Sequence, residues 1–358
     1  MGLTVSKLAQ FCGTFVLGCV LISPSFADRG VFDFERWDAM LNDIRTKAVA
    51  QKISDSTIDD TLKDSVFVPR IVKSDKNQKE FTLTLDKYLQ MTVSNERIKN
   101  GKTKRGQYKT LLHNVENKFG VQPNVILAFW GMESNYGKVK SRHQLTNAFL
   151  TLIYEGRREE FFSNQLLALM KIADKNKLNV KNIHGSWAGA MGHFQFIPTT
   201  LAQYGMDGNY DGHVDIINSI GDAMYSAANY LHKLGWNKNE KIVRRVILPG
   251  DFDRSLLNGD VKKSLSEWTD LGVTNPDGTP IPNADMVAGL VADTKEIARQ
   301  DLFHQTTTES QTESDVEIAP KPVITAYLTY PNFYRIKKWN NSSWYAIAIA
   351  ELADKLKI

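Results

Sequence analysis

The sequence predicts a mainly helical α+β protein, with helices at both ends of the chain and a small strand-rich region near residue 250. Apolar residues recur at helical spacing through most of residues 32–235, which favours amphipathic helices. From Lys241 the pattern changes, because residues 242–248 are rich in β-branched side chains and Pro/Gly turns follow. Helical spacing returns over residues 334–357, which predicts one or two closing helices.

Size and charge restrict the class of protein. A chain of 358 residues with 42% hydrophobic content can bury one large core or two to three smaller ones. The net charge of +4 and the isoelectric point near 8.8 are mildly basic. This balance suits a polyanionic surface such as a bacterial wall, but it is too weak to indicate nucleic acid.

The N-terminus has the pattern of a targeting segment. Lys7 precedes an apolar run over residues 8–22, and the small-x-small triplet that ends at Ala27 is typical of a cleavage site. We therefore predict a signal peptide over residues 1–27 and a periplasmic protein. An alternative takes residues 16–19 as a lipoprotein box, which would anchor the protein to the outer membrane through a lipidated Cys19.

Cysteine usage and hydropathy narrow the chemistry of the mature chain. Cys12 and Cys19 are the only cysteines, so cleavage after Ala27 leaves none. Disulfides, thiolate catalysis and cysteine-ligated zinc are then excluded. No later segment has about 18 uninterrupted apolar residues, so a soluble mature protein is expected.

Residues 28–115 are predicted to form an N-terminal helical region. Its helices are expected over residues 32–49, 54–65 and 81–91, and the last of these carries Tyr88. The basic stretch over residues 97–109 contains two glycines. We interpret it as a solvated loop and helix start, with a wall-binding patch as the alternative.

The central feature of residues 116–240 is a helix over residues 121–137. Pro123 suits its first turn and Gly137 can end it. Because residues 125–132 carry no charge, the carboxyl of Glu133 can be partly desolvated, which raises the pKa toward that of a general acid. The alternative is an ordinary solvated surface glutamate.

Two further stretches of this region contain candidate binding residues. Arg157 and Arg158 lie between two predicted helices, where they can grip a polar substrate or form structural salt bridges. Residues 185–198 are rich in glycine and alanine, and Gln195 is a neutral donor and acceptor between phenylalanines. This stretch suits the floor of a groove, with close helix packing as the alternative.

Residues 207–215 resemble the front of a calcium loop. Oxygen-bearing side chains occupy the first, third, fifth and ninth positions, and glycine occupies the sixth. The twelfth position is Asn218 instead of a bidentate glutamate, and an Asx-rich turn explains the same pattern. A helix ended by Gly235 follows and carries Tyr230.

The rest of the chain divides into two parts. Residues 241–325 are predicted to form the strand-rich region, with a polar, flexible loop at 301–320. Residues 326–358 are predicted to supply the closing helices, after an extended pattern over 323–330.

Three motifs in this order resemble a known family. They are WGMESNYG at 130–137, GSWAGAMGHFQFIP at 185–198, and YPNF at 330–333 followed by Trp339–Asn340. The chain is similar, over about residues 32–356, to the membrane-bound lytic murein transglycosylase B type of enzyme, glycoside hydrolase family 103. The resemblance implies a lysozyme-like helical core with an N-terminal helical region and a small antiparallel β region.

The resemblance also implies roles for individual residues. The catalytic acid of the family falls on Glu133. Calcium is not required, but some members bind it in a loop that matches residues 207–215. The implied substrate-binding residues are Tyr88, Arg157, Arg158, Ser186, Gln195, Tyr230, Tyr330 and Asn332, and the implied calcium ligands are Asp207, Asn209, Asp211, His213 and, more loosely, Asp215 or Asp222.

The chain departs from the family pattern in three places. His193–Phe194 precedes Gln195, residues 216–218 follow the candidate calcium loop as Ile-Ile-Asn, and the polar segment 301–320 is long. These departures affect the expected calcium site and the expected outline of the β region. They do not affect the assignment of Glu133 as the acid.

The sequence offers one candidate catalytic carboxyl, which is unusual for a glycosidase. Ordinary glycosidases use two carboxylates, whereas only Glu133 stands out here. The family reaction cleaves the MurNAc–GlcNAc β-1,4 bond of peptidoglycan glycan strands without water and leaves a 1,6-anhydro-MurNAc end. The alternatives are a hydrolytic muramidase resembling goose-type lysozyme and a non-catalytic wall-binding protein. We expect a monomer.

Overall fold

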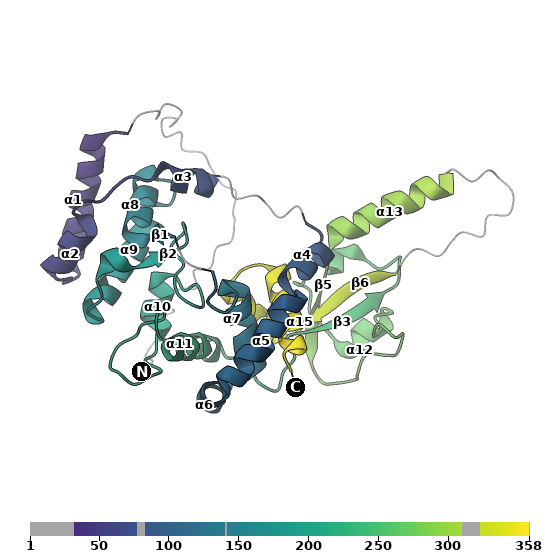
Figure 1. Ribbon diagram of the computed structural model, residues 1–358. Helices are drawn as coiled ribbons and strands as arrows, with labels where there is room; N and C mark the ends of the chain where they lie inside the picture. Colours follow the sequence, from purple (N-terminus) through teal and green to yellow (C-terminus); the bar gives the residue numbers. More distant parts are fainter. Residues whose placement is uncertain (1–31, 77–82, 140–141, 310–322, 358) are drawn as a thin grey trace, which may run out of the picture.

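The computed structural model describes residues 32–76, 83–139, 142–309 and 323–357 (Figure 1). The predicted signal peptide, Cys19 and residues 310–320 of the predicted polar loop lie outside these residues. The described part is mainly helical with a small antiparallel sheet, which confirms the predicted fold class. None of its helices is both long and apolar enough to cross a membrane.

One group of helices lies at one side of the molecule (Figure 1). Here α2 packs on α1 and on α9, and α3 packs on α8. Side-chain caps begin two of the helices, because Asp33 accepts from Arg36 N and Ser54 accepts from Thr57 N. The members are α1 (Phe34–Ala50), α2 (Asp55–Leu62), α3 (Pro69–Lys76), α8 (Leu145–Glu155) and α9 (Glu159–Lys175).

The second group surrounds α7 (Pro123–Ser134), which packs against α5, α6, α11 and α15. Most residues of α7 are buried, as its apolar run predicts. The short strands β1 (His143–Gln144) and β2 (His184–Gly185) pair with each other, and β1 and the 3₁₀ turn η1 (Val180–Asn182) contact α8 of the first group. The other helices are α4 (Leu85–Thr92), α5 (Asn95–Gln107), α6 (Lys109–Phe119), α10 (Pro198–Tyr204), α11 (Ile220–Lys233), α14 (Pro331–Trp339) and α15 (Ser343–Lys355).

The β region is a four-stranded antiparallel sheet with its own apolar core. Its strand order is β3-β6-β5-β4, so that the late strand β6 lies between two earlier ones. Trp268, Leu290 and Leu328 are fully buried in this second core. The elements are β3 (Val243–Leu248), η2 (Arg254–Leu256), β4 (Lys263–Ser264), α12 (Leu265–Asp270), β5 (Val287–Ala292) and β6 (Ile324–Thr329).

The loop predicted within residues 97–109 is wrong, because α5 continues to Gln107. Ser94 caps this helix by accepting from Arg97 N. Gly101 does not break the helix, since it permits close packing: a Cβ at this position would lie 2.4 Å from the Tyr136 hydroxyl.

The polar loop predicted at residues 301–320 is also wrong over its first part, because α13 spans Thr294–Glu309. Asp293 begins this helix by accepting from the backbone N–H groups of Lys295 and Glu296. Residues 293–296, Asp-Thr-Lys-Glu, contain this helix-start signal. The loop was predicted from the polar composition of residues 301–320, which does not take the start signal into account.

Candidate active site

Glu133 lies in the last turn of α7, where the buried helix meets the surface. Asn135 ends the helix in the left-handed conformation, with φ +48°. The Glu133 side chain is half-buried, and its Oε1 accepts hydrogen bonds from Trp339 Nε1 at 3.0 Å and from the Tyr345 hydroxyl at 2.5 Å. The carboxyl is thus held in one orientation by two neutral donors.

Burial raises the pKa of Glu133 to about 7, while the hydrogen bonds from Tyr345 and Trp339 act in the opposite direction. No Lys, Arg or His of the described part of the chain forms an ion pair with this carboxyl. Glu133 is therefore a carboxyl that can hold a proton near neutral pH and release it to a bound group.

Trp339 and Tyr345 come from the closing helices. Trp339 is the last residue of α14, and Ser342 caps α15 by accepting from Tyr345 N at 3.2 Å. Sequence reasoning missed both as site residues, although it noted Trp339 within a motif. The available signal was a pair of aromatic side chains with polar tips, six residues apart, on either side of a helix cap.

The glycine-rich stretch is attached to the end of α7. Ser134 Oγ donates to His193 O at 2.7 Å, and Trp130 Nε1 donates to His193 Nδ1 at 3.1 Å. Gln195 has φ +48°, and its Nε2 donates to Gly192 O at 2.9 Å. The Ser186 hydroxyl accepts from Ala190 N at 3.0 Å. Both predicted binding side chains thus stabilise the turns of this stretch.

Aromatic rings connect this stretch to Glu133. The Trp339 ring lies 5.1 Å from that of Phe196 and 5.1 Å from that of Tyr230. Tyr230 also stacks on Tyr204 at 4.4 Å. The structure therefore brings Tyr230 and the Gln195 segment to the tryptophan that holds Glu133.

Tyr88 lies close enough to Glu133 to be affected by its charge. Its ring is 5.9 Å from that of Trp344, the neighbour of Tyr345. Burial and the charge of Glu133 raise the pKa of Tyr88. A pocket of about 260 Å³ is lined by Tyr88 and Trp344, and a second of about 420 Å³ is lined by Ser134 and His193. One pocket therefore lies beside Trp344, the neighbour of Tyr345, and the other lies beside Ser134, the neighbour of Glu133.

Arg157 and Arg158 are placed in the N-terminal helical group. Each forms an ion pair with Asp75, a carboxylate that is only 2% exposed. This arrangement favours the salt-bridge alternative over the grip on substrate.

Tyr330 and Asn332 need correction as substrate-binding residues, because both are buried. The Asn332 side chain donates to Asn237 O and Glu240 O and accepts from Asn237 N and Arg335. Tyr330 lies in the core of the β region. Neither side chain can reach a ligand in this structure, and Asn332 instead joins α14 to the loop before β3.

The candidate calcium loop is held by its own hydrogen bonds. Asp207 accepts from Tyr210 N and Gly212 N, and Asn218 donates to Asp215. Asp222, fully buried, accepts from three backbone N–H groups of the loop.

The ligand set does not match a closed calcium site. Its oxygens suit calcium, but no three His, Asp or Glu side chains within the described ranges are grouped to hold an ion. Asn209 Nδ2 donates to Asp211, and Asp211 accepts from His213 N, so these residues also stabilise turns.

Comparisons with known proteins identify the family of the chain. The model of the transglycosylase SLT domain family matches residues 36–354. The chain therefore belongs to this family and is a lytic transglycosylase.

Individual relatives support the assignment. The chain is 27% identical to membrane-bound lytic murein transglycosylase B of Escherichia coli (strain K12), over 76% of this chain and 67% of that protein. It is 35% identical to SltB3 of Pseudomonas aeruginosa, solved in complex with NAG-anhNAM-pentapeptide, with a TM-score of 0.77 over 89% of this chain and 79% of that one. Escherichia coli Slt35 in complex with calcium has a TM-score of 0.71 at 23% identity, over 90% of this chain and 92% of that one, and shows the shared fold.

Proposed function

We propose that the protein cleaves the MurNAc–GlcNAc β-1,4 bond of peptidoglycan and leaves a 1,6-anhydro-MurNAc end, with Glu133 acting first as acid and then as base. The observation that carries the proposal is a half-buried carboxyl with two neutral hydrogen-bond donors and a pKa of about 7. Membership of the lytic transglycosylase family and the similarity to SltB3, which was solved with peptidoglycan fragments, support the substrate.

In the first step, protonated Glu133 gives its proton to the glycosidic oxygen as the C1–O bond breaks. The GlcNAc unit leaves with a free hydroxyl, and the positive charge on MurNAc is carried by an oxocarbenium ion or by an oxazolinium ion formed with its own N-acetyl group. Tyr345 and Trp339 stabilise the new carboxylate, because their hydrogen bonds favour its charged form.

In the second step, the Glu133 carboxylate removes the proton of the C6 hydroxyl, and O6 forms a bond to C1. Where the oxazolinium ion has formed, the bond between its acetyl oxygen and C1 breaks as O6 attacks, and the N-acetyl group is restored. The carboxyl regains its proton, and no water is consumed. No neighbouring carboxylate of the described residues contributes to the pKa of Glu133, which is consistent with one residue serving in both steps. Tyr88, Tyr230, Gln195 and Ser186 are proposed to line the sugar sites around it.

Mass spectrometry of sacculi digested with the purified protein tests the reaction. We expect muropeptides lighter by one water than hydrolysis products, because the anhydro bond replaces a reducing end. Reducing MurNAc ends would instead show a hydrolytic muramidase. Absence of any soluble product, with binding to sacculi retained, would show a non-catalytic wall-binding protein.

We propose a periplasmic monomer that the segment 1–27 exports. The pattern of that segment supports export, and the Escherichia coli relative is described as membrane-bound. The mass of the mature protein distinguishes the two forms: cleavage after Ala27 gives an unmodified chain, whereas a lipoprotein begins at a lipidated Cys19. Light scattering of the purified protein checks the oligomeric state.

We propose that calcium is not required for activity. The loop at residues 207–218 is supported by its Asx turns and by buried Asp222. The activity and the melting temperature should be the same in calcium and in a chelator. A melting temperature that rises with calcium would show that the side chains of Asp207, Asp211 and Asp215 rearrange to bind it, as an ion that binds only the folded state stabilises it.

A further inference from the structure

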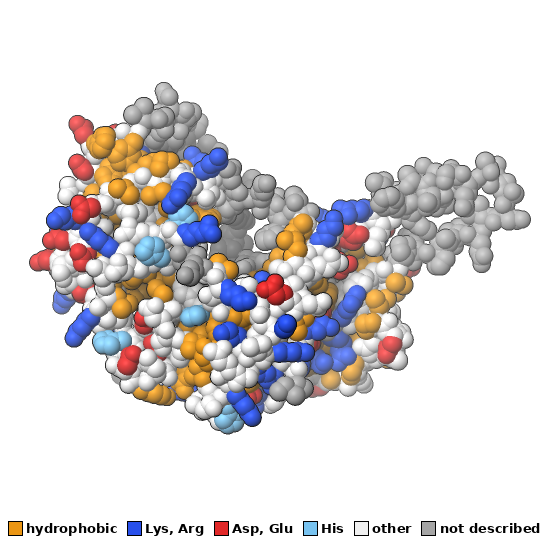
Figure 2. Space-filling view, viewed as in Figure 1, with side chains coloured by type: hydrophobic (Ala, Val, Ile, Leu, Met, Phe, Trp, Pro, Cys, Tyr) orange, Lys and Arg blue, Asp and Glu red, His pale blue; other side chains and the backbone are white. Residues whose placement is uncertain are grey.

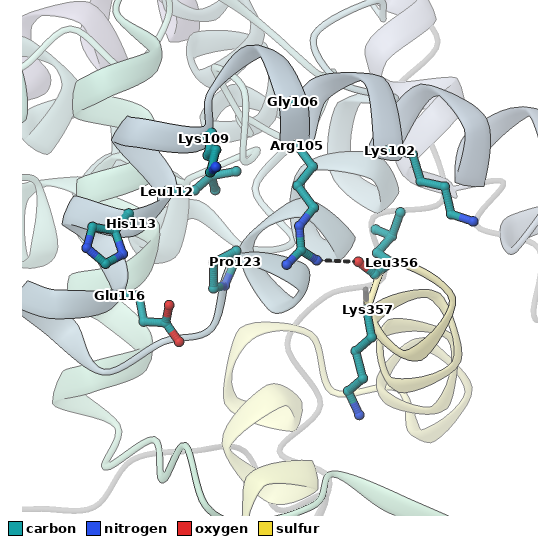
Figure 3. Close-up of a pocket in the computed structure, with 10 residues that line it drawn as sticks. All are labelled: Lys102, Arg105, Gly106, Lys109, Leu112, His113, Glu116, Pro123, Leu356 and Lys357. Carbon is teal, nitrogen blue, oxygen red and sulfur yellow. Dashed lines mark hydrogen bonds between the residues drawn. The ribbon is translucent and has the colours of Figure 1, made fainter.

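A pocket of about 660 Å³ lies beside Pro123, at the start of α7 (Figure 3), whereas Glu133 lies in the last turn of that helix. Pro123, the first residue of α7, lines it, together with Leu112 of α6 and Leu356 just after α15. These side chains give the pocket an apolar floor. Because Glu133 lies ten residues further along α7, the two sites are about 15 Å apart along the helix axis.

The rim of this pocket is strongly basic. Lys102, Arg105, Lys109 and Lys357 line it, and Glu116 is the one carboxylate among the lining residues. Lys357 is paired with Asp354, so Lys102, Arg105 and Lys109 supply most of the positive charge. Lys102, Arg105 and Lys109 form no ion pair with any residue that the structure describes. Figure 2 shows that Lys and Arg side chains outnumber Asp and Glu over this part of the molecule.

The shape of the pocket is fixed by packed elements. Arg105 donates a hydrogen bond to Leu356 O at 2.5 Å, which joins α5 to the end of α15 (Figure 3). Gly106 faces open space, because a Cβ at this position would have no atom within 4 Å. A Cβ at residue 106 therefore meets no neighbour, and a larger side chain there would extend from a residue that lines the pocket.

We propose that this pocket binds an acidic peptide segment of a partner protein, with one large apolar side chain in the pocket and carboxylates on the basic rim. The charge of the rim supplies complementarity to carboxylates. A concave site with an apolar floor suits an anchoring side chain, whereas a flat membrane surface cannot enter it. The distance from Glu133 leaves the glycan groove open while the partner is bound.

Fluorescence anisotropy of the full-length mature protein tests this inference. The probe is a fluorescein-labelled poly-glutamate peptide with one central phenylalanine. The same peptide with alanine in place of phenylalanine should bind at least tenfold more weakly, and the matching poly-lysine peptide should not bind. Equal binding of the phenylalanine and alanine peptides would overturn the role of the apolar pocket.

Two variants locate the binding site. Gly106→Trp fills the pocket and should weaken peptide binding at least tenfold, whereas Gly106→Ala leaves it open and serves as the matched control. Lys102→Glu/Lys109→Glu should abolish binding, while Lys171→Glu/Lys177→Glu, an equal charge change at exposed lysines of another surface, should not. All four variants should keep the parent's activity on sacculi, which also checks their folding.

The outcomes separate the proposal from its rival. If the peptide binds the pocket variants as tightly as the parent, the site lies elsewhere and the inference fails. If vesicles of phosphatidylglycerol bind and the peptide does not, with vesicle binding lost in Lys102→Glu/Lys109→Glu, the surface faces a membrane and the inference is again overturned. Neither result bears on the reaction proposed for Glu133, which the product analysis tests separately.

Discussion

Two carboxylates removed from water, Glu133 in the core and Asp75 in the N-terminal helical group, are stabilised in different ways. Asp75 is matched by the guanidinium groups of Arg157 and Arg158. Glu133 accepts only from the neutral donors Trp339 and Tyr345, and burial raises its pKa to about 7. The same chemical group is thus paired with two cations in one region and only with neutral donors in the other.

The difference shows what distinguishes a structural carboxylate from a catalytic one. Adjacent cations favour the charged form of a carboxyl, so that it holds no proton to donate. Neutral donors position the group and leave the neutral form accessible. The ion pairs of Arg157 and Arg158 therefore favour a structural role, whereas the lack of a cation beside Glu133, among the described residues, supports the proposed role as acid.

The largest expected effect comes from Glu133→Gln, which keeps the shape of the side chain and removes its proton. Turnover of sacculi should fall at least about 1,000-fold, because one group serves as both acid and base. Binding to sacculi should remain. Glu351→Gln is the matched control, since Glu351 is also a half-buried carboxyl whose pKa burial raises, but no contact joins it to Glu133. An equal loss of turnover in both variants would contradict the proposed catalytic role of Glu133.

The next effect concerns Asp75. Arg157→Ala/Arg158→Ala leaves a buried carboxylate without a cation, which should lower the free energy of unfolding by about 3 kcal/mol. Adding Asp75→Asn should restore part of the loss. Urea denaturation measures both. Arg254→Ala, which breaks the more exposed pair with Asp301, should cost under about 1 kcal/mol. A raised KM for sacculi with unchanged stability would instead assign both arginines to substrate.

A smaller effect is expected from Tyr345→Phe. The loss of a hydrogen bond to the Glu133 carboxylate should lower kcat about tenfold, since such bonds contribute about 1.5 kcal/mol. Because that bond lowers the pKa of Glu133, its removal should move the alkaline limb of the pH profile upward. Tyr327→Phe is the matched control: its hydroxyl bonds to Glu351, and the limb should not move. An unmoved limb in Tyr345→Phe contradicts the proposed role of the bond.

The last prediction concerns the pH dependence of activity and stability in the unmodified protein. In the proposed reaction Glu133 starts protonated, and burial raises the pKa of this group from 4.5 to about 7. kcat/KM should therefore be retained below pH 7 and should fall about tenfold for each pH unit well above it. The stability contributed by the neutral carboxyl has the same sign, because it is present below about pH 4.5 and is lost as pH rises through about 7. Denaturation curves at pH 6 and 8, compared with Glu133→Gln, check the second statement.

Local pattern and motif were sufficient for the fold class and for the position of Glu133. The apolar run of α7 predicts a buried helix by itself, because a helix buried on all sides has no polar face. The end of that helix was therefore recognisable as a place where a carboxyl leaves the core. The change of period after Lys241 likewise indicated the sheet.

The partners of Glu133 could not be read from local pattern. Trp339 and Tyr345 are separated from it by 206 and 212 residues, and only tertiary packing brings them together. The motif at 330–333 led to the wrong side chains for a different reason. Tyr330 and Asn332 hold α14 in place, so their fixed positions serve Trp339 indirectly.

The long sequence separation of Glu133 from Trp339 and Tyr345 also sets the order in which the site can assemble during folding. An exported chain that crosses the membrane N-terminus first presents α7 long before α14 and α15 arrive. Until those helices pack, Glu133 lacks both donors that orient it, and closing such a long loop is a late step of folding. With the proposed role for Glu133, the chain is therefore expected to gain activity only after α14 and α15 have packed.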